Sequence, residues 1–149
     1  MAPAPRITLL TRIALPIQTV FELWTRPEHV ARWWGGLRGW VMNASIDART
    51  GGEFWIAVVL EGGRGYDNVG KFSDVIPGEA LIAEWEHGEG RTSQLVVQLL
   101  ELGRVTEVTL THREFPDEQL RDYHLARWQD ALAELERYAA RLPKDGVKP

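Results

Sequence analysis

The stretch PDEQLRDYHLARWQDALAELERYAARL, residues 116–142, decides the fold of this 149-residue chain. Its apolar and aromatic residues recur every three to four positions, which predicts one amphipathic helix of about 25 residues. The opposite face carries charges of both signs and is predicted to be solvated. The residues of the repeating face are Leu120, His124, Trp128, Leu132, Leu135, Tyr138 and Leu142.

Glycine-containing breaks divide the chain before this helix into short segments of alternating polar and apolar residues. The breaks recur at roughly 8–12-residue spacing, which is typical of an antiparallel meander rather than of βαβ units. A first strand is predicted at Arg6–Ala14, and two short helices follow it, starting near Pro16 and Pro27. The later strands are predicted at Trp40–Asp47, Glu53–Leu60, Tyr66–Val75, Ala80–His87, Thr92–Leu100 and Val105–His112.

The order of these elements predicts an α+β fold in one domain, residues 6–142, with flexible termini at residues 1–5 and 143–149. Only the long C-terminal helix is large enough to cover one face of a sheet of about seven antiparallel strands, so the helix is expected to lie across that face. If the sheet curves around the helix and the two short helices close one end, a cavity remains inside.

The composition of the chain excludes several classes of function. The 17 basic and 21 acidic side chains give a net charge of −4, which argues against general nucleic-acid binding. There is no cysteine, so disulfides, thiolate metal sites and thiol nucleophiles are excluded. A chain without disulfides is compatible with the reducing cytoplasm, where we expect this protein to be located. The longest apolar run, Phe54–Leu60, is far short of the ~20 residues that span a membrane. The four histidines are scattered without a metal-binding spacing, and no cofactor is expected.

Short motifs along the whole chain carry a family resemblance. They include Val20–His29, Trp33-Trp34-Gly35, Gly51–Phe54, Gly70-Lys71-Phe72, Pro77-Gly78-Glu79, Leu81–Trp85, Leu110-Thr111-His112 and Phe115–Glu118 leading into His124 and Trp128. With these motifs the sequence resembles the START/Bet v 1-like superfamily, and within it the bacterial single-domain relatives of the activator of the Hsp90 ATPase. The resemblance implies a helix-grip fold with an internal pocket for an apolar small molecule and no universal catalytic residue.

Candidate ligand-binding residues follow from strand alternation and from the inward face of the helix. His112 and His124 are the polar candidates, and an imidazole there can orient a ligand or act as an acid–base. The plainer interpretation is that both histidines cap a helix or form hydrogen bonds with nearby residues. His29 and His87 are expected to be solvated. The complete candidate set is Phe54, Ile56, Phe72, Trp85, Val97, His112, His124 and Trp128.

Two classes of function remain. The first is binding of an apolar or aromatic small molecule between the sheet and the C-terminal helix, for transport, sensing or sequestration. The alternative is a cofactor-free enzyme of polyketide cyclase or hydrolase type that uses His112 or His124, and an Hsp90 co-chaperone role ranks last. The outward apolar residues Trp55, Ala57, Val59, Val96 and Leu100 indicate either a homodimer or a strand register shifted by one residue.

Overall fold

The computed structural model describes residues 3–144 and contains one seven-stranded sheet with three helices. Residues 1–2 and 145–149, which belong to the expected flexible termini, lie outside the described residues. The elements are β1 (Ile7–Ile13), α1 (Ile17–Thr25), α2 (Pro27–Trp33), β2 (Gly39–Ile46), β3 (Glu53–Leu60), β4 (Gly65–Ile76), β5 (Ala80–Glu86), β6 (Thr92–Leu102), β7 (Val105–Arg113) and α3 (Glu118–Ala140).

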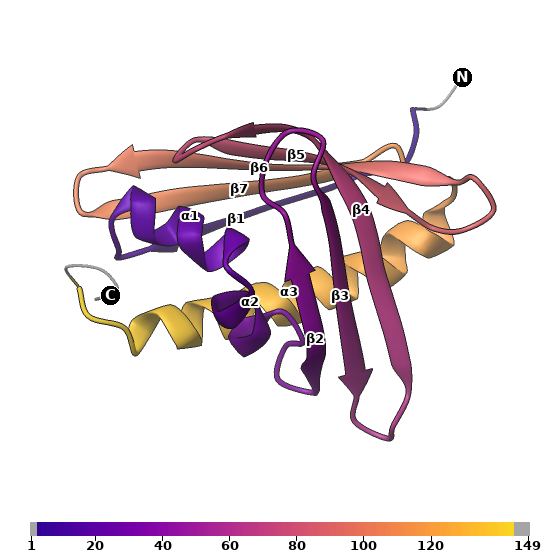
Figure 1. The fold of residues 1–149 in the computed structure, drawn as a ribbon, viewed down its shortest axis with the longest axis horizontal. Helices are drawn as coiled ribbons and strands as arrows, with labels where there is room; N and C mark the ends of the chain where they lie inside the picture. The colour runs from indigo at the N-terminus through magenta and orange to yellow at the C-terminus, as the bar shows by residue number, and fades with distance from the viewer. Residues whose placement is uncertain (1–2, 145–149) are drawn as a thin grey trace.

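The strand order is β1-β7-β6-β5-β4-β3-β2, and every neighbouring pair is antiparallel. Strands β2 to β7 therefore form a meander, and β1 pairs with β7 at the edge of the sheet. The sheet curls around α3, while α1 and α2 pack at one end of the curl (Figure 1). The predicted α+β helix-grip fold is confirmed, and β3 has the predicted bounds.

Irregular positions in the strands allow the sheet to curve. The register shifts between Val41 and Asn43 on β2 and between Phe72 and Asp74 on β4, and such bulges bend a strand and increase its twist. Gly70 allows close packing on the concave side, because a Cβ atom there would collide with the Phe54 ring and with the Glu84 carbonyl oxygen. The Phe54 ring can therefore lie directly over the β4 backbone.

Helix α3 is fixed at its start and along its buried face. The Asp117 side chain accepts a hydrogen bond from the Leu120 backbone N–H at 2.8 Å and so caps the first turn. Farther along, Glu136 accepts a hydrogen bond from Thr11 of β1 at 2.7 Å. The buried residues of α3 are His124, Trp128, Ala131, Leu132, Leu135, Tyr138 and Ala139.

The expectation that His29 is solvated is wrong. This histidine of α2 is buried rather than solvated, because its Nδ1 atom and the Tyr138 hydroxyl of α3 share a hydrogen bond of 2.7 Å. The two residues are 109 positions apart in the sequence, so no local sequence pattern could predict this contact. His87 is half-buried at the end of β5 and bonds Ser93 at 2.6 Å.

The outward apolar residues do not form one patch, which corrects the expected arrangement. Trp55 and Val59 belong to β3, whereas Val96 and Leu100 belong to β6, and two strands lie between them. Trp55 is 41% exposed, so the alternative of a shifted register is wrong. The outward neighbours of Trp55 and Val59 across the sheet are instead Val69 and Trp40.

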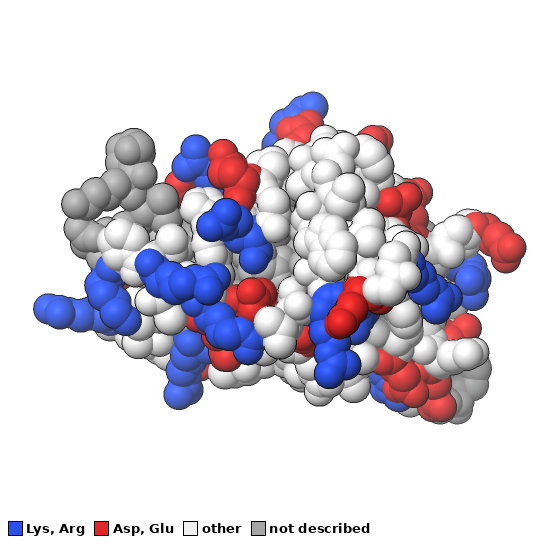
Figure 2. All heavy atoms as spheres, turned by 90° about the horizontal axis from the view of Figure 1, so that it is seen from below, with Lys and Arg blue, Asp and Glu red and all other residues white. Residues whose placement is uncertain are grey.

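The molecular face seen in Figure 2 carries basic and acidic side chains next to one another around an uncharged area. This mixture of charges agrees with the small net charge of −4. Within residues 3–144, no helix is both long enough and apolar enough to cross a membrane.

Trp128→Ala is expected to lower the free energy of unfolding by about 3–5 kcal/mol, because it removes a buried ring from the interface between α3 and the sheet. Urea denaturation measures the change. The exposed neighbour Gln129 provides the control, since Gln129→Ala removes no buried surface and should change stability little. An unchanged unfolding free energy for Trp128→Ala would contradict the placement of the helix.

Candidate functional site

Five of the seven tryptophans form a continuous cluster inside the curl of the sheet. Trp24 and Trp33 meet edge to face, with ring centroids 4.7 Å apart. Trp34 and Trp85 lie nearly parallel at 6.0 Å, and Trp128 meets their edges at 5.1 and 5.8 Å. The cluster thus joins α1, the end of α2, β5 and α3, and its flat rings leave two gaps.

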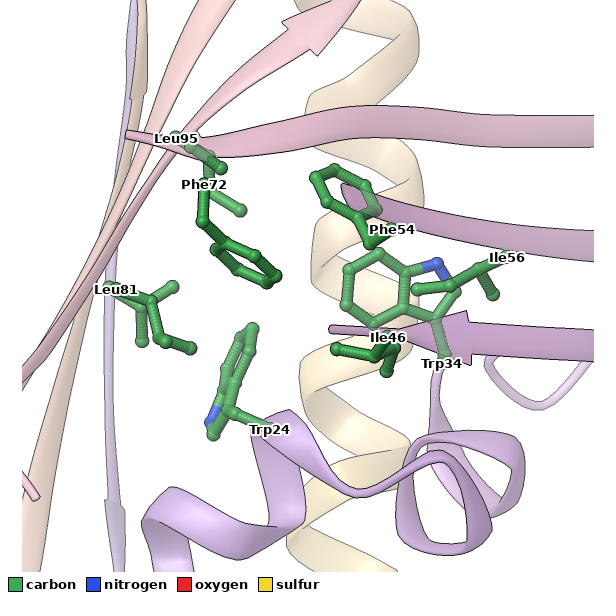
Figure 3. Close-up of a pocket in the computed structure, with 10 residues that line it drawn as sticks. Trp24, Trp34, Ile46, Phe54, Ile56, Phe72, Leu81 and Leu95 are labelled. Atoms are coloured by element: carbon green, nitrogen blue, oxygen red, sulfur yellow. The ribbon is translucent and has the colours of Figure 1, made fainter. Parts of the chain in front are cut away.

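The first gap, here called the apolar cavity, lies between the sheet and the helices α1 and α2. Its volume is about 30 Å³. The rings of Trp24, Phe54 and Phe72 point toward this common space (Figure 3). The lining contains only apolar and aromatic residues, namely Trp24, Trp34, Ile46, Phe54, Ile56, Phe72, Leu81, Ala83, Leu95 and Val97.

Four of the eight candidate residues, Phe54, Ile56, Phe72 and Val97, line the apolar cavity. The cavity lies against α1 and α2 rather than against α3, because the Trp85 and Trp128 rings fill the space below α3. Sequence reasoning missed Trp24 and Trp34 as lining residues. The paired Trp33-Trp34 before two glycines was the available signal, since two adjacent rings at a helix end cannot both lie on one helix face.

The second gap, here called the polar cavity, lies between β4 and α3 and has a volume of about 20 Å³. It holds three of the other candidates, Trp85, His124 and Trp128. Its remaining lining residues are Trp34, Tyr66, Asn68, Arg127 and Ala131. The Asn68 side-chain nitrogen is buried here and has no hydrogen-bond partner among the described residues.

His112 lines neither cavity, and its hydrogen bonds fix its protonation. The Trp128 indole N–H donates to His112 Nδ1 at 3.0 Å, so a neutral His112 carries its proton on Nε2. His112 Nε2–H then donates to Ser93 Oγ, with 2.7 Å between Nε2 and Oγ, and the Ser93 hydroxyl in turn donates to His87 Nε2 at 2.6 Å. The chain Trp128–His112–Ser93–His87 therefore runs in one direction, and His112 has no nitrogen left for a substrate.

Burial keeps these histidines neutral. Desolvation, with smaller contributions from His124 and His87, lowers the pKa of His112 from 6.5 to about 2. Desolvation and the nearby His87 lower the pKa of His124 to about 4. Both ring nitrogens of His112 thus have protein partners, and these lie 16 and 19 residues away in the sequence rather than nearby as the plainer interpretation expected. His124 is also neutral at pH 7, but its ring borders the polar cavity.

Three histidine rings meet here, with His87, His112 and His124 at centroid distances of 5.2–6.3 Å. Their nitrogens are nevertheless not arranged around a common point, because His112 and His87 bond Ser93. Across the described part of the chain, no group of three histidine or acidic side chains could hold a metal ion.

The sequence comparison now decides the family. Residues 14–140 match the family described as activator of Hsp90 ATPase homolog 1-like protein. The chain belongs to this family. The stated resemblance is therefore confirmed, and the match covers most of the chain, from the end of β1 to the end of α3. No curated protein matches the sequence of this member of the family.

Several solved structures share the fold of this chain. A protein from Chromobacterium violaceum is 19% identical, with a TM-score of 0.81 over 92% of this chain and 98% of its own. An AHSA1-like protein from Aeromonas hydrophila is 23% identical, with a TM-score of 0.78 over 91% and 92%. An HSP90 activator from Plasmodium falciparum is 19% identical, with a TM-score of 0.69 over 91% and 96%. These likenesses establish the fold alone.

The lowered histidine pKa values predict that stability falls in mild acid. Between pH 6.5 and about 4, His112 and His124 become protonated in the unfolded chain but stay neutral in the folded protein. Unfolding therefore becomes more favourable as the pH falls. The limiting slope is about 1.4 kcal/mol per pH unit for each such histidine. Urea denaturation from pH 7 to pH 5 measures it. His124→Gln should reduce the proton uptake on unfolding by about one, and an unchanged slope would contradict the burial of neutral His124.

Proposed function

We propose that this protein binds a flat apolar or aromatic small molecule in its interior, as a cytoplasmic carrier, sensor or sequestering protein. The observation that carries the proposal is the apolar cavity, since side chains from seven segments line a gap whose walls are almost entirely apolar. Such a gap stays dry, and its walls lack part of their packing contacts. An apolar guest restores these contacts, and binding is therefore favourable.

A guest of drug-like size requires the cavity to open. Ligand sites usually measure about 300–1,000 Å³, far more than the gap of about 30 Å³. Trp34 is the wall best suited to move, because it follows α2 and precedes Gly35 and Gly36. Gly36 has a positive φ of 74°, a backbone conformation that glycine adopts without strain. Trp34 also borders the polar cavity, so its displacement would join the two gaps.

Two other functions rank lower. A cofactor-free enzyme would have to use His124, because His124 borders the polar cavity whereas both nitrogens of His112 are bonded to Trp128 and Ser93. The lowered pKa of His124 makes it a weak base. An Hsp90-related role is suggested by the family description and by the activator from Plasmodium falciparum, but this fold alone does not carry it.

Naphthalene serves as the probe for the binding proposal. It should raise the melting temperature, and the rise should continue with increasing naphthalene concentration, because a ligand of the folded state alone stabilises that state by mass action. Ala83→Val adds two methyl groups to the cavity wall and should weaken binding at least fivefold in calorimetric titration. Ala126→Val, on the exposed face of α3, is the matched control and should bind as the wild type does. Equal binding by both variants would place naphthalene elsewhere.

We further propose that the outward face of β2–β4 packs against a second copy of the chain. Trp40 and Trp55 are 53% and 41% exposed there, Ala57 and Val59 lie between them along β3, and Val69 lies beside Trp55 on β4. Strand β2 is also an edge strand, so half of its backbone hydrogen-bonding groups are available for a partner. A self-complementary apolar patch of this kind suits a two-fold interface.

Sedimentation velocity at micromolar concentration is expected to detect this dimer. Trp55→Lys places a charge in the centre of the patch and should yield a monomer with unchanged secondary structure. Leu100→Lys introduces the same charge at a somewhat more exposed site on β6, outside the patch, and should remain dimeric. A wild-type protein that sediments as a monomer would refute the interface.

A further inference from the structure

The polar cavity has features that a packed protein interior does not need. It is buried between β4 and α3, yet Tyr66, Asn68, His124 and Arg127 direct polar groups to its walls. The floor is aromatic and consists of Trp34, Trp85 and Trp128. A volume of about 20 Å³ admits an oxygen atom the size of a water molecule without rearrangement.

Asn68 is the first sign of a missing ligand. Its side chain is only 4% exposed, and the side-chain nitrogen has no hydrogen-bond acceptor within residues 3–144. A buried amide donor without a partner destabilises a fold, so such groups are rare and call for a physical reason. An acceptor atom in the cavity would satisfy the donor.

Arg127 is the second sign. Its half-buried guanidinium faces the cavity from α3, and no carboxylate within residues 3–144 lies within ion-pair distance of it. Other arginines of α3 are paired, such as Arg121 with Asp122 at 2.7 Å and Arg137 with Glu134 at 2.7 Å. A planar guanidinium without a carboxylate partner among these residues is well suited to bind the carboxylate of a ligand.

Tyr66 reports on the local electrostatics. Burial and the adjacent Tyr123 raise the pKa of the Tyr66 hydroxyl, whereas the positive charge of Arg127 and the donor groups of Arg127 and Asn68 near the Tyr66 oxygen lower it. The surroundings are thus apolar enough to exclude a solvated anion but contain two groups that favour negative charge. Tyr66 also packs edge to face on the exposed Tyr123, with centroids 6.3 Å apart, at the outer side of the site.

We propose that the polar cavity binds the carboxylate of an aromatic acid, with Arg127 and Asn68 as the donors. The inference rests on the proposed function, because the flat apolar body of the same molecule would occupy the apolar cavity. Trp34 lines both cavities, so a single displaced ring connects the acidic head to its aromatic body. Neutral His124 and the Tyr66 hydroxyl complete the polar wall.

A matched pair of probes, 2-naphthoate and 2-naphthamide, tests the proposal by calorimetric titration. The two molecules have nearly the same shape, and only the first is an anion. The wild type should bind 2-naphthoate at least tenfold more tightly than 2-naphthamide, because a charge-assisted hydrogen bond to Arg127 contributes enough binding free energy for this difference. Arg127→Met should abolish this preference and leave 2-naphthamide binding unchanged. Arg137→Met removes the same charge about 15 Å along the helix and should keep the preference.

Asn68→Leu separates a binding role from a structural one. Removing the unpartnered amide should raise the melting temperature without ligand and weaken 2-naphthoate binding, whereas a structural Asn68 would only lose stability. Equal binding of both probes by the wild type and by Arg127→Met would overturn the carboxylate site and leave the proposed function intact. If neither probe binds, nor naphthalene, the proposed function and this inference both fail.

Discussion

The hydrogen bond from the Trp128 indole to His112 is the contact on which the interior depends. It is a buried link of 3.0 Å between α3 and β7, and it fixes the depth at which the helix lies in the curl of the sheet. The indole N–H determines the tautomer of His112, and His112 determines the orientation of Ser93 and His87. One donor thus orders a polar chain within an otherwise aromatic core, and burial keeps both linked histidines neutral.

The position of Trp128 also divides the interior. Its ring, together with Trp85, fills the space directly below the middle of α3, so the gaps lie on either side of the ring cluster. One gap has apolar walls and the other has an unpartnered amide and an unpaired guanidinium. Trp34 separates them and is the ring beside two glycines. An amphiphilic aromatic ligand matches this arrangement better than a wholly apolar one does.

The fold could be predicted from sequence because its determinants are local. The alternation of Phe54, Ile56 and Val58 fixes which face of β3 is buried, and the periodicity of residues 116–142 fixes the covering helix. The cavities could not be predicted, since they depend on how rings from different elements meet. Asn68 occupies an inward position of β4, but its lack of a partner is a property of the surrounding side chains alone. His29 likewise depends on Tyr138, far away in the sequence.

The central claim is that a flat aromatic guest enters the protein rather than adhering to its surface. Nuclear magnetic resonance of the seven tryptophan indole N–H groups, during titration with naphthalene, tests it most directly. The indoles of Trp24 and Trp34, which line the apolar cavity, should shift, and those of the exposed Trp40 and Trp55 should not. Shifts confined to Trp40 and Trp55 would contradict the account, because they would mean that naphthalene binds only the outward face of the sheet.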